Sequence, residues 1–431
     1  MRWIRRTAAV VLSLLLLWLL LALSGWLPPI PEANRQSLQA LREPPQWPAP
    51  QGNAFHAVWL GSYELDASER ARLAALDPDA MIRELAQRTA VQRGSALWPG
   101  QCGWPHTGCA AALRESGLQE DPAALEALRA LYRYDHFRNL ATPSIEIPFP
   151  ALQGLDQPAR VAAVQRFDAG EHSAALGLLC EDAAFWRRLR ANTDLLLVDM
   201  VGVAYLSADA TLFAELLAEL SPESDLPPQC ERALAPLADQ ELDQCRVFSG
   251  EFALLEQGFD DAALAGELAG ADATPVWRRW LVRPLFHREH MLGQIAPAYT
   301  AFCGPEHAQR IAERARFPDG APVPDRCNAL EWGFNAVGCV LAEVGSPSWA
   351  AYYERVLDLD SRLKLVSTAL WLRQQPAGQP LPLLFDTRPL PLREAGAELV
   401  VDDGAAALRV RLRHRRGNAD HYTIPVAAPQ Q

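Results

Sequence analysis

The stretch FWRRLRANTDLLLVDMVGVAYL, residues 185–206, decides the fold because its second half is apolar on every side. Phe185 and Trp186 give it an amphipathic start, and LLLVDMVGVAYL (195–206) is interrupted by a single charged residue, Asp199. A helix that is apolar all round is buried inside a bundle of helices. Its 12 residues, one of them Asp199, are too few to cross a bilayer, which needs about 20. We therefore expect this segment to form the centre of a folded helical body.

Outward from this segment, helical patterns follow one another along the chain. Asp77-Pro78 and Asp121-Pro122 each place an N-cap acceptor before a proline at the first helical position. Further helices are expected at residues 230–244, 274–303, 305–316, 327–343 and 347–375. Residues 397–401, 407–413 and 421–426 alternate as strands do, with Leu408, Val410 and Leu412 on one face. The sequence therefore predicts a mainly α fold that ends in a few strands.

Four parts are expected along the chain. Residues 1–27 form a cytoplasmic stub and a transmembrane anchor, and residues 28–52 form a proline-rich linker. Residues 53–375 form an irregular multi-helix bundle body, with a candidate sub-boundary at 221–229. Residues 376–431 form a small antiparallel β tail.

The N-terminus resembles a membrane anchor because no charged residue occurs between Arg6 and Glu32. Residues 8–27 are long enough to span the hydrocarbon core, and the arginines before them favour a cytoplasmic N-terminus. A single-pass protein of the bacterial inner membrane with a periplasmic body is the expected result. The alternative is a signal peptide cleaved near Ser24, which would leave a secreted or periplasmic body.

Residues 28–50 of the linker hold seven prolines, and the linker is expected to be extended. At roughly 3.1 Å per residue it would hold the body up to about 70 Å from the membrane. A short helix is allowed between its two proline clusters, at residues 37–42.

Eight cysteines in an exported body favour structural disulfides, because no CxxC pair suggests a metal site. Sequence cannot choose among 105 pairings. The shortest loops favour three local bridges, Cys102–Cys109, Cys230–Cys245 and Cys303–Cys327. Cys180 and Cys339 lie in apolar helical patterns and are as readily interpreted as free buried thiols.

The charge balance excludes some partners. A formal net charge of −12 repels phosphate, so no nucleic acid partner is expected. No G-x-S-x-G, P-loop, G-x-G-x-x-G or EF-hand pattern is present, and no cofactor is expected. The sequence alone does not name an activity.

The residues that most resemble a catalytic site are His287 and His290, in FHREHMLG. Two histidines three apart on a helix share a face and could bind a metal with a distant carboxylate. The spacing is not that of H-E-x-x-H, and a buried histidine beside a solvated one is the favoured interpretation. Asp199 is interpreted as a buried salt bridge with an arginine, and Glu331 in the same way.

Four stretches together carry a resemblance: NAFHAVWLG (53–61), FWRRL…MVGVAYL (185–206), RLKLVSTALWLRQQ (362–375) and the C-terminal strand pair. In this order they resemble uncharacterised membrane-anchored bacterial envelope proteins, and the resemblance implies no function. We expect a non-enzymatic interaction or structural module that binds another envelope protein. The alternative is an envelope hydrolase with a metal or carboxylate site near His287 and His290.

Overall fold

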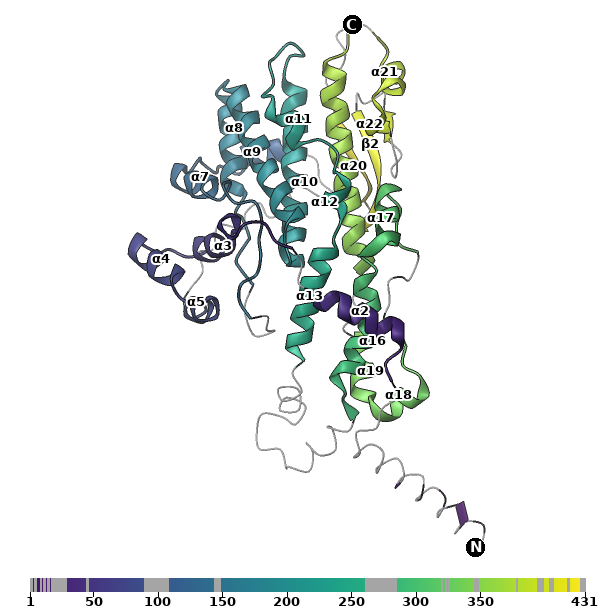
Figure 1. Ribbon diagram of the computed structural model, residues 1–431. Coiled ribbons are helices and arrows are strands. Elements are labelled where there is room, and N and C mark those ends of the chain that lie inside the picture. Colours follow the sequence, from purple (N-terminus) through teal and green to yellow (C-terminus); the bar gives the residue numbers. More distant parts are fainter. Residues whose placement is uncertain are drawn as a thin grey trace.

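The computed structural model is mainly helical, with a three-stranded antiparallel sheet near the C-terminus (Figure 1). It describes residues 29–43, 46–88, 108–142, 149–259, 285–318, 326–344, 349–376, 379–393, 399–402, 407–416 and 419–426, with isolated residues elsewhere. The helices are α2 (Glu32–Arg42), α3 (Phe55–Gly61), α4 (Ala67–Ala74), α5 (Pro78–Leu85), α6 (Cys109–Glu115), α7 (Pro122–Arg129), α8 (Gln157–Asp168), α9 (His172–Ala191), α10 (Leu196–Glu219), α11 (Gln229–Ala233), α12 (Asp239–Leu242), α13 (Cys245–Gly258), α16 (Arg288–Thr300), α17 (Gly304–Ala312), α18 (Ala329–Phe334), α19 (Ala336–Val344), α20 (Trp349–Arg373), α21 (Leu381–Thr387) and α22 (Leu390–Arg393). The strands are β1 (Leu399–Asp402), β2 (Ala407–Arg416) and β3 (Ala419–Pro425).

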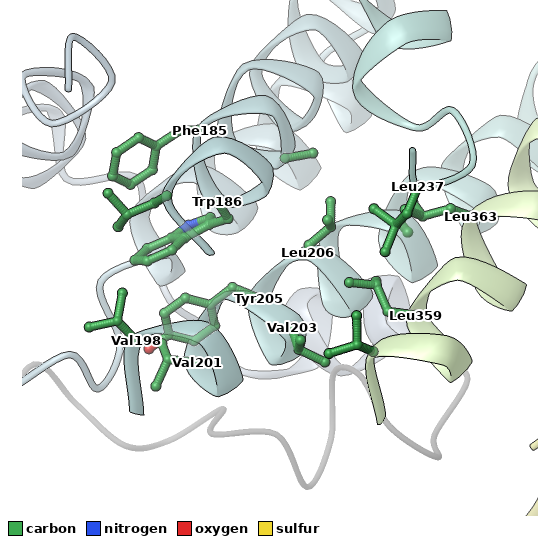
Figure 2. Close-up of a cluster of buried hydrophobic side chains, with 14 of the residues drawn as sticks. Phe185, Trp186, Val198, Val201, Val203, Tyr205, Leu206, Leu237, Leu359 and Leu363 are labelled. Carbon is green, nitrogen blue, oxygen red and sulfur yellow. The ribbon is translucent and has the colours of Figure 1, made fainter. Parts of the chain in front are cut away.

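Helix α10 lies at the centre of the molecule, packed against α9, α20, α6 and β3. Trp186 of α9 contacts Tyr205 of α10 with ring centroids 4.8 Å apart, and Leu206 lies toward α20 on another side (Figure 2). Within the described part of the chain, α10 is the one helix long and apolar enough to span a membrane, and 78% of its apolar window is buried. This burial identifies α10 as a core helix.

The central segment is correctly predicted to be buried, but it is two helices. Helix α9 ends at Ala191, and α10 begins at Leu196 after a turn that contains Asp194. Helix α10 then continues without a break through Asp209 to Glu219.

The C-terminal sheet confirms the predicted antiparallel β tail. Its strand order is β1-β2-β3, with Leu408 of β2 opposite Val401 and Ile424. The predicted apolar face of β2, Leu408, Val410 and Leu412, is buried, and β2 packs against α20. The hydroxyl groups of Tyr422 and Thr211 lie 2.8 Å apart and join β3 to α10.

Local sequence patterns correctly predicted some helix ends but did not predict where long helices are interrupted. Asp77 and Asp121 cap α5 and α7 as predicted, each accepting backbone N–H bonds in the first turn. The single helices expected at 230–244 and 327–343 are wrong, since α11 and α12 are separate and α18 ends before Asn335. The helix expected at 274–303 begins only at Arg288, and residues 274–284 lie outside the described residues.

The disulfides join different cysteines from those expected. Cys180 pairs with Cys230, Cys245 with Cys303, and Cys327 with Cys339. The predicted Cys230–Cys245 and Cys303–Cys327 bridges are therefore wrong, and so is the interpretation of Cys180 and Cys339 as free thiols. The first two bridges span 50 and 58 residues, and they form because α11 packs back on α9 and α13 packs on α16.

Cys109 is also disulfide-bonded. Cys102 lies outside the described residues, so the Cys102–Cys109 bridge stays a prediction.

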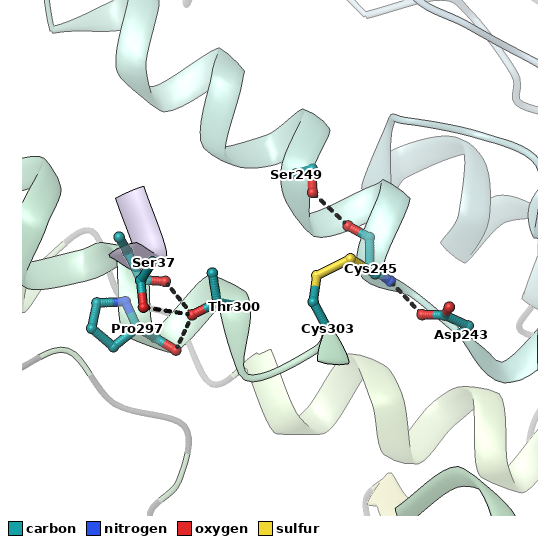
Figure 3. The surroundings of a disulfide bond; sticks show 8 residues. Ser37, Asp243, Cys245, Ser249, Pro297, Thr300 and Cys303 are labelled. Carbon is teal, nitrogen blue, oxygen red and sulfur yellow. Dashed lines mark hydrogen bonds between the residues drawn. A yellow bond between two sulfur atoms is a disulfide. The ribbon is translucent and has the colours of Figure 1, made fainter. Parts of the chain in front are cut away.

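The proline-rich segment is not a free spacer, because its middle is helix α2, docked on α16 and α13. Leu38 and Leu41 are buried beneath it, and Arg42 reaches Glu256 of α13 at 2.6 Å and Glu289 of α16 at 2.7 Å. The hydroxyl of Thr300 donates to Ser37 of α2 close to the Cys245–Cys303 disulfide (Figure 3). The predicted 70 Å spacer is therefore wrong. The segment is part of the body.

The proposed anchor, residues 8–27, lies almost entirely outside the described residues. Its membrane location therefore stays a prediction.

Candidate functional site

The two histidines singled out by the sequence lie at the start of α16. His287 is half-buried and precedes the helix, and its backbone N–H donates to Asn335 Oδ1 at 2.8 Å. His290 is buried, and this burial lowers its pKa. Among the described residues, no group of three or more His, Cys, Asp or Glu side chains could hold a metal ion. The clearest role of this segment is to join α16 to the turn between α18 and α19.

Asp199 has the structural role that the sequence suggested. One carboxylate oxygen accepts from Arg190 Nε at 2.9 Å and the other from Gln244 Nε2 at 2.6 Å. Glu331 does not share this role. Its carboxylate accepts from the backbone N–H of Asn328, at 2.7 Å, in a capping box at the start of α18.

Sequence reasoning missed a buried acid cluster between α8, α9 and α10. Asp182 and Asp209 face each other, and Arg160 forms ion pairs with Asp209, at 2.9 Å, and with Asp156. Tyr132 donates to Asp182 Oδ1 at 2.9 Å. Two carboxyl groups that are buried side by side repel each other when both are ionised. Burial, and then the charge of Asp209, raises the pKa of Asp182 well above its usual range.

A second missed pair of carboxyl groups lies at the N-terminus of α10. Asp194 accepts from the backbone N–H of Asn139 at 2.9 Å, and Glu251 of α13 accepts from that of Leu196 at 2.8 Å. Burial raises the pKa of Asp194 to about 6. Burial, together with the charge of Asp194, raises the pKa of Glu251 to about 7. The pair can hold protons near neutral pH, although each group is already bound to a backbone N–H.

Helix α13 lies very close to this carboxyl pair because Gly250 has no side chain. A Cβ atom at Gly250 would overlap the backbone carbonyl of Asp194. Beside it, Trp47 lies within cation–π distance of Arg246 and Arg138, at 5.1 and 5.6 Å from the ring centroid. The sequence did not predict this site, because its residues are far apart along the chain. Residues 47, 138, 194 and 246–251 come together only in the folded structure.

Two groups of large apolar side chains are exposed. The proximal surface comprises Leu330, Trp332, Val340 and Val344 of α18 and α19. The distal surface comprises Leu383 of α21, Leu390 of α22 and Val400 of β1. Figure 1 shows these two sets of helices at opposite ends of the molecule. Exposed apolar clusters of this kind mark contact surfaces.

Comparison of the chain with protein-family models, curated proteins and solved structures found no match. The functional argument therefore rests on the chain's own residues.

Proposed function

We propose that this chain is a single-pass envelope protein of the bacterial inner membrane, anchored by residues 8–27, with its helical body in the periplasm. The observation that best supports this proposal is that the cysteines form disulfides. Three disulfides are formed, two of them between cysteines 50 and 58 residues apart, and no cysteine in the described part of the chain is free. Such bonds persist in the oxidising periplasm and are rare in the cytosol.

The proposed activity is binding, and the distal surface is the proposed site for another envelope protein. Leu390 is 61% exposed, and the helices α21 and α22, which carry Leu383 and Leu390, lie at the end of the molecule away from α18 and α19 (Figure 1). An apolar surface on that end points away from the bilayer, so a protein partner is the occupant that it fits. Asp199 and Glu331, the two acids singled out in the sequence, are bound within the fold and give catalysis no support.

We do not favour the hydrolase alternative near His287 and His290. His290 is buried, and His287 is held by its backbone to Asn335. Neither histidine is thereby placed to bind a metal ion or to activate a nucleophile.

Topology is tested with two reporter enzymes fused after Gln431, one active only in the periplasm and one only in the cytoplasm. The proposal expects activity from the first alone, and the reverse pattern would overturn it.

Partner binding is tested by placing a photo-crosslinking amino acid at position 390 or 383 of the full-length chain in intact cells. A discrete crosslinked product is expected at both positions and not at the exposed control position 126 on α7. The position-390 product should also disappear when Leu383 is changed to Ser. Equal labelling at positions 390 and 126 would remove the distal surface as the binding site.

A further inference from the structure

The proximal surface is rigid as well as apolar. The Cys327–Cys339 disulfide closes α18 against α19, and Asn335 between them accepts the backbone N–H of His287. No charged residue occurs from Trp332 to Ala342, and Val344 is 77% exposed. A fixed surface of this kind keeps its apolar side chains in water unless something covers them, at a cost of roughly 25 cal/mol for each Å².

The chain enters the body at this same end. Ile30, just before α2, lies against α16, where a Cβ atom on Gly293 would be 2.9 Å from its Cγ2 atom. Helix α16 packs on α2 along one side and on α19 along another. The proximal surface is therefore carried by the helices next to the point where the proposed anchor joins the body (Figure 1).

Chain length limits how far this end can be from the membrane. Only Pro28 and Pro29 lie between Leu27, the end of the proposed anchor, and Ile30, and the three Cα-to-Cα steps span at most about 11 Å. The headgroup region beyond the hydrocarbon is roughly 5–8 Å thick on each side. With the anchor in the bilayer, Ile30 and the adjoining part of α16 therefore lie in the headgroups or just above them.

We propose that the proximal surface is a second membrane contact, in which Trp332 and Val344 insert into the periplasmic leaflet. This inference rests on the proposed anchor. Tryptophan is favoured at the membrane interface, where its ring is partly apolar and its N–H remains hydrated. Glu331 and Glu343 flank the surface, so apolar burial and not attraction to anionic lipid drives the contact. The matching lipid is zwitterionic, and the contact is insensitive to salt.

The test places an environment-sensitive fluorescent amino acid at position 344 of the full-length protein in phosphatidylcholine vesicles. Lipids with a quencher on the upper acyl chain are expected to quench its emission, with no change between low and high salt. The matched control is position 390 on the distal surface, where no quenching is expected. In the Val340→Ser variant, quenching at position 344 should weaken, while the exposed position of residue 340 leaves the fold intact.

The remaining outcomes separate the inference from the proposed function. Alkaline extraction of the same vesicles first establishes whether the chain is anchored. An anchored chain without quenching at position 344 overturns the inference and leaves the anchor standing. A chain that alkali extracts overturns the anchor, and quenching at position 344 before extraction then still supports lipid contact. Blue-shifted emission that lipid quenchers do not reduce would mean that protein covers the surface, and would also overturn the inference.

Discussion

Replacing Glu251 with Gln should make the protein more stable at alkaline pH. Glutamine keeps an oxygen that can accept the backbone N–H of Leu196, which Glu251 accepts at 2.8 Å. It cannot ionise, whereas the wild-type carboxyl must lose its proton beside Asp194 in a desolvated site. The substitution therefore removes an electrostatic cost and preserves a hydrogen bond.

The magnitude follows from the pKa of Glu251. Burial and Asp194 raise it from 4.5 to about 7, which at about 1.4 kcal/mol for each pH unit corresponds to about 3 kcal/mol. Because the folded state binds this proton more tightly than the unfolded state, its contribution is complete below pH 4.5 and is lost as the pH rises through 7. Glu251→Gln should thus match the wild type near pH 4.5 and exceed it by up to about 3 kcal/mol at pH 8.

Denaturant unfolding of the full-length protein in detergent, at pH 4.5 and pH 8, measures this difference in the free energy of unfolding. Glu126→Gln on α7 is the matched control, since Glu126 is exposed, and it should show no comparable gain. A Glu251→Gln variant that is less stable than the wild type at pH 8 would show that the ionised carboxylate is stabilising. The reasoning from burial would then be wrong.

Three further predictions concern packing. Peptide mapping without reductant should recover Cys180 linked to Cys230, and replacing both with Ser should lower the free energy of unfolding by about 4 kcal/mol, measured with denaturant, because the bridge closes a 50-residue loop. Asp199→Leu should cost about 3–5 kcal/mol in the same assay by leaving Arg190 unpaired, and adding Arg190→Met should recover part of the loss. Leu38→Asp should release α2, so that hydrogen exchange speeds up in α2 but not in β2.

Helix and strand content were predictable because their signals are local. The caps at Asp77 and Asp121 need only their own first turn, and the alternation in β2 needs only one strand. The break at Asn335 was not predictable, since apolar residues flank it on both sides. At the break, the Asn335 side chain accepts the backbone N–H of His287, which is 48 residues away in the sequence.

The charged sites show the same limit. Asp199 could be interpreted correctly because one acid within an apolar helix requires a partner wherever it is buried. Asp182 and Asp209 gave no such signal, because their pairing depends on how α9 packs against α10. The wrong disulfide pairings have the same cause, since the shortest loop is the best guess only until the helix packing is known.

In the proline-rich segment, the composition predicts an extended chain, whereas the positions of the apolar residues predict a helix. Its many prolines predict an extended chain. Leu38 and Leu41, however, are three residues apart, which places two apolar side chains on one face of a helix. A helix of 11 residues is marginal alone, so α2 depends on its contacts with α16 and α13. With the proposed anchor in the bilayer, the few residues before α2 set the distance between body and membrane. The prolines that follow α2 do not affect this distance. A segment that by composition is a spacer then holds the proximal surface against the lipid.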